Sequence, residues 1–344
     1  MSATNPKSWP KYIWDRPTIP PPPGVTPNLI NPYSMHPYGV LTQSVCLTIA
    51  TLLVWIRIWT KKFVLGGLGW EDCSTVIAWV LLVAYGSTLL VTDNYGYGKH
   101  LWNVKLSDYV MFAKLILANQ ILYNVLIFFA KLSIMLLYLR IFNLVRSTYI
   151  ILCILIWLNL LFYTAATFFE AFQCRPIEKM WFVHLPGTCV NQHAAQVSAA
   201  AWNTVSDLAI LILPIASVWK LQMRSKRKAG IIVIFGTGII GCIASIIRMI
   251  VVIKQSRSDD GTWKTYTLGL WSTAEVTCAI VVACLPPVPA FVRHIRGMTK
   301  KGSKSSAPSN EKVPPQEIPR MMRKDNSWDE IAELELSSTG THSV

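Results

Sequence analysis

Seven apolar stretches follow one another between residues 40 and 292, and each is long enough to cross a lipid bilayer. An α-helix needs about 20 mostly apolar residues to span the hydrocarbon core, because it rises about 1.5 Å per residue. Unlike the surface helices of soluble proteins, these stretches have no polar face opposite an apolar one. The chain is therefore predicted to be an all-α membrane protein, a bundle of seven transmembrane helices at about 40–56, 73–91, 115–137, 149–169, 195–219, 229–253 and 268–292.

The composition agrees with a membrane protein and argues against a nucleic-acid-binding one. Apolar residues make up 52% of the chain and charged residues only 15%, whereas soluble domains hold about 25% charged residues. The net charge of +14 is spread over short loops and a tail, so no soluble domain presents it as one basic patch. We therefore expect the lipid bilayer, and no nucleic acid, as a partner.

Lysines and arginines between the stretches predict the orientation of the chain. Loops one, three and five hold ten of them, including Arg57, Lys61 and Lys62, and the longer loops two, four and six hold eight. Cytoplasmic loops of membrane proteins are enriched in these residues. The N-terminus is therefore expected outside and the C-terminus in the cytoplasm. A cytoplasmic partner is expected to contact the basic fifth loop at Arg224, Lys226, Arg227 and Lys228.

Three segments of different character are predicted. Residues 1–37 are polar and proline-rich, which is typical of an extended, extracellular N-terminal tail. Residues 38–296 contain the seven-helix membrane domain. Residues 297–344 are rich in Lys, Ser, Pro and Glu and have too little apolar surface to fold alone, so a disordered cytoplasmic tail is expected there.

The eight cysteines do not cluster as they would in a disulfide-rich module. Only Cys174 and Cys189 share a loop that is predicted to be extracellular, where the compartment is oxidising. A bond between them closes a loop of about 15 residues and contributes about 3 kcal/mol in the chain-entropy account. Two free thiols are the alternative; we expect a disulfide.

Four ionisable residues lie at membrane depth, where a charge without a partner or a cavity is costly. Helical rise places Lys131, Asp207 and Glu275 near the midplane and Arg248 nearer the outer leaflet. Two readings stay open: a ligand-binding or switching site at the centre of the bundle, and a fixed ion-pair network that orients the helices. The predicted polar network comprises Gln120, Asn124, Lys131, Asn203, Asp207, Arg248, Trp271 and Glu275.

No cofactor is expected from the sequence. A retinal protein needs a lysine in its seventh helix for the Schiff base, and residues 268–292 contain none. The spacings of His36, His100, His184 and His193 match no metal-ligand pattern, so surface or loop-packing roles are expected for these residues.

The order and spacing of several short strings resemble the fungal rhodopsin-domain family of integral membrane proteins. That family includes receptor-like proteins of plant-pathogenic fungi and a membrane protein encoded in satratoxin gene clusters. The resemblance covers about residues 38–296 and implies a receptor-like, seven-helix protein of the fungal plasma membrane. The strings are Trp70-Glu71-Asp72, Tyr95-Gly96-Tyr97-Gly98-Lys99-His100-Leu101-Trp102, Lys131-Leu132-Ser133, Tyr138-Leu139-Arg140-Ile141-Phe142, Phe172-Gln173-Cys174-Arg175-Pro176, Leu213-Pro214, Trp219-Lys220-Leu221-Gln222, Ile246-Ile247-Arg248 and Leu285-Pro286.

The function expected from these observations is that of a receptor-like, GPCR-like sensor. A small or lipophilic molecule shifts the bundle, and the basic third cytoplasmic loop reports the change to a signalling protein. The alternative is a membrane-embedded enzyme or accessory protein of secondary metabolism, in which Asp207 or Glu275 acts as an acid. A transporter is disfavoured because the seven stretches show no internal repeat.

Overall fold

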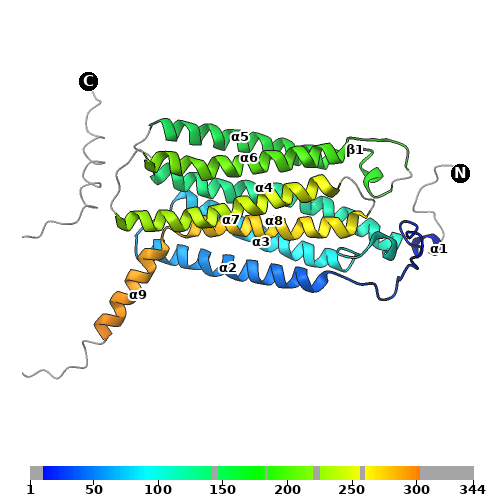
Figure 1. Cartoon of the computed structure of the whole chain (residues 1–344), viewed down its shortest axis with the longest axis horizontal. Coiled ribbons are helices and arrows are strands. Elements are labelled where there is room, and N and C mark those ends of the chain that lie inside the picture. Colours follow the sequence, from blue (N-terminus) through cyan, green and yellow to red (C-terminus); the bar gives the residue numbers. More distant parts are fainter. Residues whose placement is uncertain (1–10, 142–145, 183–184, 220–224, 256–259, 303–344) are drawn as a thin grey trace, which may run out of the picture. The chain divides into compact units, whose positions relative to one another are not determined.

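A computed structural model of the chain describes residues 11–141, 146–182, 185–219, 225–255 and 260–302. Contacts divide the chain into two units, Met1–Gly297 and Met298–Val344. Within the described residues, seven helices are long and apolar enough to cross a membrane (Figure 1), which confirms the predicted multi-pass membrane protein. These helices are α2 (His36–Phe63), α3 (Trp70–Asp93), α4 (Leu106–Ile141), α5 (Arg146–Ala171), α6 (Gln192–Trp219), α7 (Ser225–Gln255) and α8 (Gly261–Cys284).

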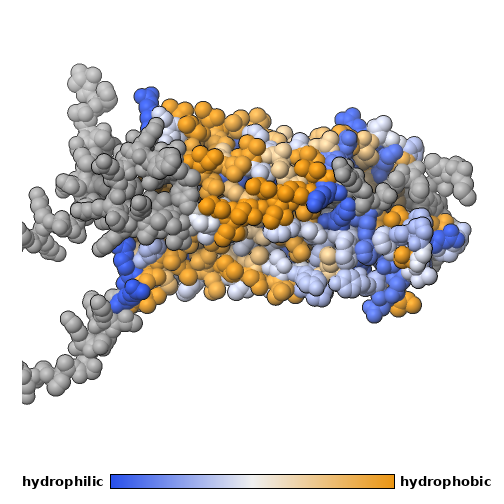
Figure 2. All heavy atoms as spheres, viewed as in Figure 1, coloured by the Kyte–Doolittle hydropathy of each residue, from blue (hydrophilic) through white to orange (hydrophobic). Residues whose placement is uncertain are grey.

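Helices α4 and α8 lie at the centre of the bundle. Helix α8 packs against α2, α3, α4 and α7, and α4 packs against α3, α5 and α8. Helix α5 is the least buried of the seven. On the face drawn in Figure 2, hydrophobic residues cover the middle of the bundle and hydrophilic residues lie towards its two ends. This is the distribution that a hydrocarbon layer requires.

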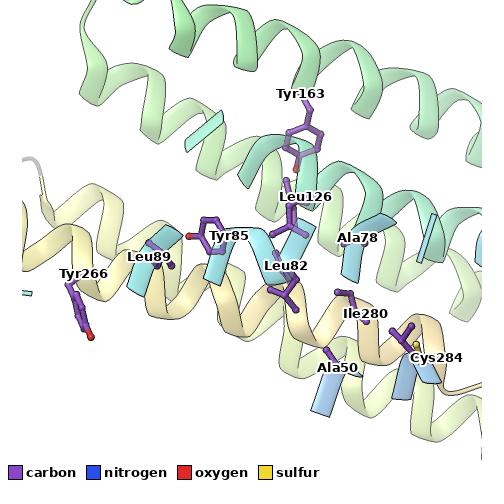
Figure 3. Packing of buried hydrophobic residues seen from close by; sticks show 14 of the residues in the cluster. Ala50, Ala78, Leu82, Tyr85, Leu89, Leu126, Tyr163, Tyr266, Ile280 and Cys284 are labelled. Carbon is purple, nitrogen blue, oxygen red and sulfur yellow. The ribbon is translucent and has the colours of Figure 1, made fainter. Parts of the chain in front are cut away.

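Apolar packing between α2, α3, α4 and α8 forms the larger core. Leu82 of α3 and Leu126 of α4 are almost completely buried, and Ile280 of α8 has no exposed surface. Figure 3 shows this core extending along α8 from Tyr266 near one end of the bundle towards Cys284 at the other. These contacts along the whole length of α8 hold the central helices in fixed positions relative to one another. The polar groups described in the next subsection lie on these helices or contact them.

The end of the bundle that carries the loop between α5 and α6 is called the disulfide end. Cys174 and Cys189 are bonded there, which confirms the predicted disulfide. The two cysteines belong to the paired strands β1 (Cys174–Arg175) and β2 (Thr188–Cys189), with the short helix η3 (Ile177–Met180) between them.

The N-terminal segment packs at the same end. It contains a single helical turn, α1 (Lys11–Trp14), whose Trp14 ring meets the edge of Phe182. Thr18 Oγ1 donates a hydrogen bond of 2.9 Å to the carbonyl of Val104, which follows the short helix η2 (Leu101–Asn103). The described part of the proline-rich tail is therefore attached to loops of the membrane domain.

Two helix boundaries differ from the sequence prediction in ways that matter for charge. Helix α2 continues to Phe63, so Arg57 and Lys61 are buried residues of a helix and not residues of a loop. The prediction stopped at residue 56 because the cations that follow were assigned to the aqueous phase.

The last membrane helix also differs. It is α8, Gly261–Cys284, and not 268–292. Its first turns are polar and aromatic, but Thr262 and Tyr266 are buried there. Thr262 donates a 2.6 Å hydrogen bond to the carbonyl of Lys99, and Tyr266 donates one of 2.9 Å to the carbonyl of Met35. After Cys284 the sequence Pro286-Pro287 interrupts the helix, because proline has no N–H and its ring clashes with the preceding turn. A separate helix, α9 (Val288–Gly302), follows.

This boundary corrects the statement that the seventh helix has no lysine. Lys264 lies in the first turn of α8 and donates a 3.3 Å hydrogen bond to the carbonyl of Lys254. It stands eleven residues, about 16 Å by helical rise, before Glu275. It is therefore far from the centre of the bundle, and independence from retinal remains an expectation.

Candidate ligand site in the membrane core

Lys131 of α4 and Asp207 of α6 form a buried ion pair. Lys131 Nζ lies 2.9 Å from Asp207 Oδ1, and the Lys131 side chain is only 1% exposed. The same nitrogen donates to the carbonyl of Asn203 (3.0 Å) and to Ser206 Oγ (2.5 Å). Three oxygen acceptors, one of which is the Asp207 carboxylate, therefore offset the loss of hydration around this ammonium group.

Arg248 of α7 and Glu275 of α8 form a second pair. Arg248 Nε lies 3.0 Å from Glu275 Oε2, yet this nitrogen makes no aligned hydrogen bond with the described residues. The guanidinium carbon lies 4.9 Å from the centre of the Tyr123 ring, within the range of a cation–π contact. Charge and the aromatic face hold Arg248 in place, which leaves its hydrogen-bonding capacity incompletely used.

Asn203 of α6 lies between the two pairs and connects four helices. Its Nδ2 is within hydrogen-bonding reach of Asp207 Oδ2 (3.2 Å), of Ser245 Oγ on α7 (2.9 Å) and of Glu275 Oε1 on α8. Its Oδ1 accepts a 2.8 Å hydrogen bond from Tyr163 on α5. Because an amide NH₂ has only two hydrogens, the three acceptors compete for it. Asn203, Lys131, Asp207, Arg248 and Glu275 are called the polar core.

Two cavities adjoin the polar core. One, of about 50 Å³, lies towards the end opposite the disulfide and is lined mainly by apolar side chains, with Asp207 and Glu275 among them. The other, of about 90 Å³, lies towards the disulfide end and is called the polar cavity. It reaches Asn203 and Arg248 at one side and Tyr97 at the other. A cavity of this size and polarity has room for several waters or for part of a ligand.

A larger groove lies between α5 and α6, which run side by side in Figure 1. Its volume is about 460 Å³, and it is called the side groove. The side groove and the polar cavity have four lining residues in common. They are Gln120, Glu170, Gln196 and Ala199.

Glu170 is the acidic residue at the junction of the two spaces. Its Oε2 accepts a 2.7 Å hydrogen bond from Asn124 Nδ2. Within the part of the chain that the structure describes, no Lys, Arg or His nitrogen lies within 4.0 Å of its carboxylate. Glu170 therefore differs from Asp207 and Glu275, which have cationic partners.

Tyr97 lines the polar cavity towards the disulfide end. Its hydroxyl donates a 3.0 Å hydrogen bond to the carbonyl of Thr265. Burial raises the pKa of Tyr97 well above its ordinary value. The phenol therefore remains a neutral donor across the physiological pH range.

Most of the predicted network residues are brought together, and one is not. Lys131, Asn203, Asp207, Arg248 and Glu275 form the polar core, while Gln120 and Asn124 line the polar cavity. Trp271 lines neither of the two cavities nor the side groove, although it stands one helical turn before Glu275. A role of these residues in ligand binding remains a prediction.

The predicted cytoplasmic contact cannot be placed. Arg224 lies outside the described residues. Lys226, Arg227 and Lys228 belong to the first turn of α7 and not to a loop, and their side chains also lie outside the described part.

Sequence reasoning missed several members of the site. Glu170 was assigned to a loop, because the fourth helix was predicted to end at residue 169, whereas α5 continues to Ala171. Tyr163 and Ser206 were not singled out, since one hydroxyl in an apolar helix is common. Ser245 is predicted from the sequence to belong to a stripe of small residues with Gly238 and Gly241, and such a stripe brings helices close together.

A second group of charges lies at the end opposite the disulfide and is called the ion cluster. Lys61 Nζ lies 2.5 Å from Glu71 Oε1 and 2.8 Å from Asp72 Oδ2, both at the start of α3. Arg140 of α4 reaches the same Glu71 oxygen at 2.6 Å. Arg57 binds Asp72 and also donates to the carbonyl of Ala283 at the end of α8. The ion cluster thus joins α2, α3, α4 and α8.

The described residues contain no group of three or more His, Cys, Asp or Glu side chains placed to hold a metal ion. His100 has a packing role in this part of the chain. Its ring is stacked on Trp102 and Trp263, with centroid distances of 4.5 and 4.2 Å, and its Nδ1 lies 2.5 Å from Asp260.

Comparison with known proteins identifies relatives of this chain. Residues 56–294 match the family described as the fungal rhodopsin domain. A SAT4 family membrane protein of Emericella nidulans is 44% identical over 248 residues, which are 71% of this chain and 60% of that protein. A "Fugralins biosynthesis cluster protein 2" of Gibberella zeae is 29% identical over 86% of this chain and 76% of its own length.

A more distant relative is named as a receptor. The "Receptor GIN3" of Arthrobotrys oligospora is 24% identical over 79% of this chain and 66% of its own length. No solved structure matches the chain. The match over residues 56–294 confirms the resemblance that the sequence strings indicated.

Proposed function

Because the chain belongs to the family of the fungal rhodopsin domain, we propose that it is a receptor-like protein that senses a small or lipophilic molecule and signals to the cytoplasm. The proposed location is the plasma membrane of a fungus. The proposed activity requires neither retinal nor catalysis.

One observation carries this proposal: the polar core lies between two cavities and has more acceptors than donors at its centre. Asn203 Nδ2 has three acceptors within reach and can bond to two of them at a time. Free volume on both sides gives these side chains room to exchange partners. A molecule that favours one set of bonds shifts the population of the bundle towards that arrangement.

The signal is proposed to leave through α4 and α8. Lys131 of α4 and Glu275 of α8 belong to the polar core. The same two helices contribute Arg140 and the carbonyl of Ala283 to the ion cluster at the other end. A small shift of either helix therefore changes both groups of charges.

The proposed orientation places the disulfide end outside the cell. Disulfides form and persist in oxidising compartments, and Cys174 and Cys189 are bonded at this end. The N-terminal segment packs at the same end, through Thr18 and Trp14. The ion cluster and the C-terminal segment then belong to the cytoplasmic side, which agrees with the positive-inside rule.

A role in secondary metabolism is the second candidate, because three relatives are named for biosynthesis clusters. In that case the chain is a membrane-embedded enzyme or an accessory protein. The acids that an enzyme would use, Asp207 and Glu275, each lie beside a cation. These two acids are therefore less available to a substrate.

A fluorescent label on Cys73 tests the sensor. Cys73 is the one exposed free cysteine in the described part of the chain, and it lies next to Asp72 of the ion cluster. The full chain in nanodiscs is labelled at Cys73 and exposed to a lipid extract of fungal cultures. We expect a saturable change of emission that Asn203→Ala abolishes. Asn159→Ala is the matched control, because Asn159 is also fully buried but, within the described residues, bonds only to the Leu155 carbonyl of its own helix.

Two results decide against the sensor. An emission that stays constant in every extract, while the label is fully attached, contradicts signalling through this end. Steady consumption of an extract component that stops in Glu275→Gln supports the enzyme instead.

A further inference from the structure

We propose that the side groove is the entrance and apolar half of a binding site for an amphipathic molecule that arrives through the bilayer and carries a hydrogen-bond-donating head, a hydroxyl or an amine. Glu170 binds that head at the junction with the polar cavity. This inference rests on the proposed function and specifies its ligand class and its path of entry.

The position of the side groove favours entry from the lipid. Its walls are Phe162, Ala166 and Phe169 on α5 and Ala195 and Ala199 on α6. Helix α5 is the least buried of the membrane helices, so this part of the bundle faces the surrounding hydrocarbon. The small alanine side chains leave the space that an aliphatic body fills.

The lining of the groove becomes polar where it meets the cavity. Gln120, Glu170 and Gln196 line both spaces, so a molecule in the groove reaches these side chains first. Beyond them the polar cavity continues to Asn203 and Arg248 of the polar core. Occupation of the junction therefore lies close to the groups that are proposed to exchange partners.

Charge selects the head group. Lys131 pairs with Asp207 and Arg248 pairs with Glu275, which leaves Glu170 as the carboxylate without an ion-pair contact among the described residues around the cavity. Its described hydrogen bond comes from the neutral amide of Asn124. A hydroxyl or amine donates a hydrogen bond to such a group, whereas a carboxylate has no donor to offer it.

A second hollow on α5 provides a matched control. It is lined by Tyr149, Ile150, Cys153, Ile154, Trp157, Leu158 and Leu161, and its volume of about 490 Å³ is close to that of the side groove. Its lining is almost wholly apolar. A probe that merely dissolves in lipid next to α5 has no reason to prefer the side groove over this hollow.

Three photoreactive probes with one tail and different heads test the site: the diazirine derivatives of dodecanol, dodecylamine and dodecanoate. The full chain in nanodiscs is irradiated with each, and the labelled peptides are mapped. We expect the alcohol and the amine to label residues 162–173 and 190–199 about tenfold more than the carboxylate does, as a loss of one charge-assisted hydrogen bond predicts. Excess unlabelled dodecanol should remove this labelling.

Two variants test the residues that carry the proposal. Glu170→Gln is nearly isosteric and should reduce labelling by the amine about tenfold, and labelling by the alcohol less, since an amide still accepts a hydrogen bond. Ala199→Trp should block the junction and reduce labelling by both probes. Ile154→Trp, in the control hollow, should leave labelling of the side groove unchanged.

Equal labelling by all three heads, labelling that unlabelled dodecanol does not compete with, or equal labelling of the control hollow overturns the proposal. These results do not depend on the emission of Cys73. Saturable labelling of the side groove without a change of emission at Cys73 contradicts the proposed sensor function and leaves the proposed binding site standing. A response at Cys73 that is unaffected by Glu170→Gln and Ala199→Trp contradicts the entrance alone.

Discussion

Arg57 Nε lies 2.7 Å from Asp72 Oδ1, and the Arg57 side chain has no exposed surface. A buried guanidinium without its carboxylate keeps a charge that nothing neutralises. The pair therefore fixes the end of α2 to the start of α3. The adjacent acids Glu71 and Asp72 should consequently contribute unequally to stability.

We expect Asp72→Asn to destabilise the protein more than Glu71→Gln does. Asp72→Asn leaves Arg57 buried without a counter-charge, which costs about 3–5 kcal/mol. Glu71 pairs with Lys61 and with Arg140. Lys61 keeps Asp72 as a second partner and the Arg140 side chain is 62% exposed, so Glu71→Gln leaves no buried cation without a counter-charge and should cost less, about 1–2 kcal/mol. Thermal unfolding of the purified chain in detergent measures both variants. Equal losses would contradict the ranking.

The Lys131–Asp207 pair should show strong coupling. Lys131→Met and Asp207→Leu each leave one buried charge and should each lower the free energy of unfolding by about 3 kcal/mol. The double variant removes both charges, so its loss should be smaller than the sum of the two. A double-mutant cycle measured by chemical denaturation gives the coupling. An exactly additive result would show that the two side chains do not interact.

Exchanging the two charges should restore stability only in part. In Lys131→Asp with Asp207→Lys, the hydrogen bonds from Lys131 Nζ to the Asn203 carbonyl and to Ser206 are lost. The unfolding temperature of the chain with exchanged charges is therefore expected to lie between those of the single variants and that of the original chain. A swap that folds no better than either single variant would argue against direct pairing.

Removal of the disulfide should destabilise the protein by about 3 kcal/mol, since the bond closes a loop of 15 residues. The double variant Cys174→Ser with Cys189→Ser and treatment of the original chain with a reductant should lower the unfolding temperature equally. Cys73→Ser is the control and should leave the effect of the reductant intact. If the reductant still lowers the unfolding temperature of the double variant, the effect has another origin.

Gly39→Ala should be costly and Gly236→Ala should not. A Cβ at Gly39 would collide with the Tyr266 hydroxyl, which bonds to the Met35 carbonyl, whereas a Cβ at Gly236 meets no neighbour within 4 Å. Overpacking of this kind costs about 1–3 kcal/mol. Tyr266→Phe should recover part of the loss. The comparison of unfolding temperatures among the four chains checks the contact between α2 and α8.

Membrane-impermeant maleimide tests the proposed orientation. Cys73 is exposed at the end opposite the disulfide, and Ile30, which is 97% exposed, belongs to the N-terminal segment. In intact cells the maleimide should react with Ile30→Cys and not with Cys73. In inside-out vesicles the pattern should reverse. Reaction of both thiols from the same side would reject the orientation.

Hydropathy alone predicted the seven helices, because the hydrocarbon layer imposes length and apolarity on every spanning segment. Boundaries were less certain wherever a charged side chain enters the bundle. Arg57, Lys61 and Glu170 were assigned to loops, and each is a helix residue whose partners are on other helices. The partners are distant in sequence, so the sequence around each charged residue does not indicate that it belongs to a helix.

The types of charge in the polar core were predicted, but its geometry was not. A spacing of four residues places Asn203 and Asp207 on one helix face, and the same spacing aligns Trp271 with Glu275. Only packing between helices decides that Asn203 reaches α5, α7 and α8 while Trp271 lies away from the cavities. For the same reason the side groove, which is formed by two helices, has no signature in either one.

The bond between Cys174 and Cys189 has a consequence for how the bundle can move. Cys174 follows the last residue of α5 by three positions, and Cys189 precedes the first residue of α6 by three. The bond therefore keeps the disulfide ends of α5 and α6 together, and it does not restrain the opposite ends of these helices. A ligand that enters from the water must pass the loop that this bond closes, whereas a ligand that enters from the lipid need not.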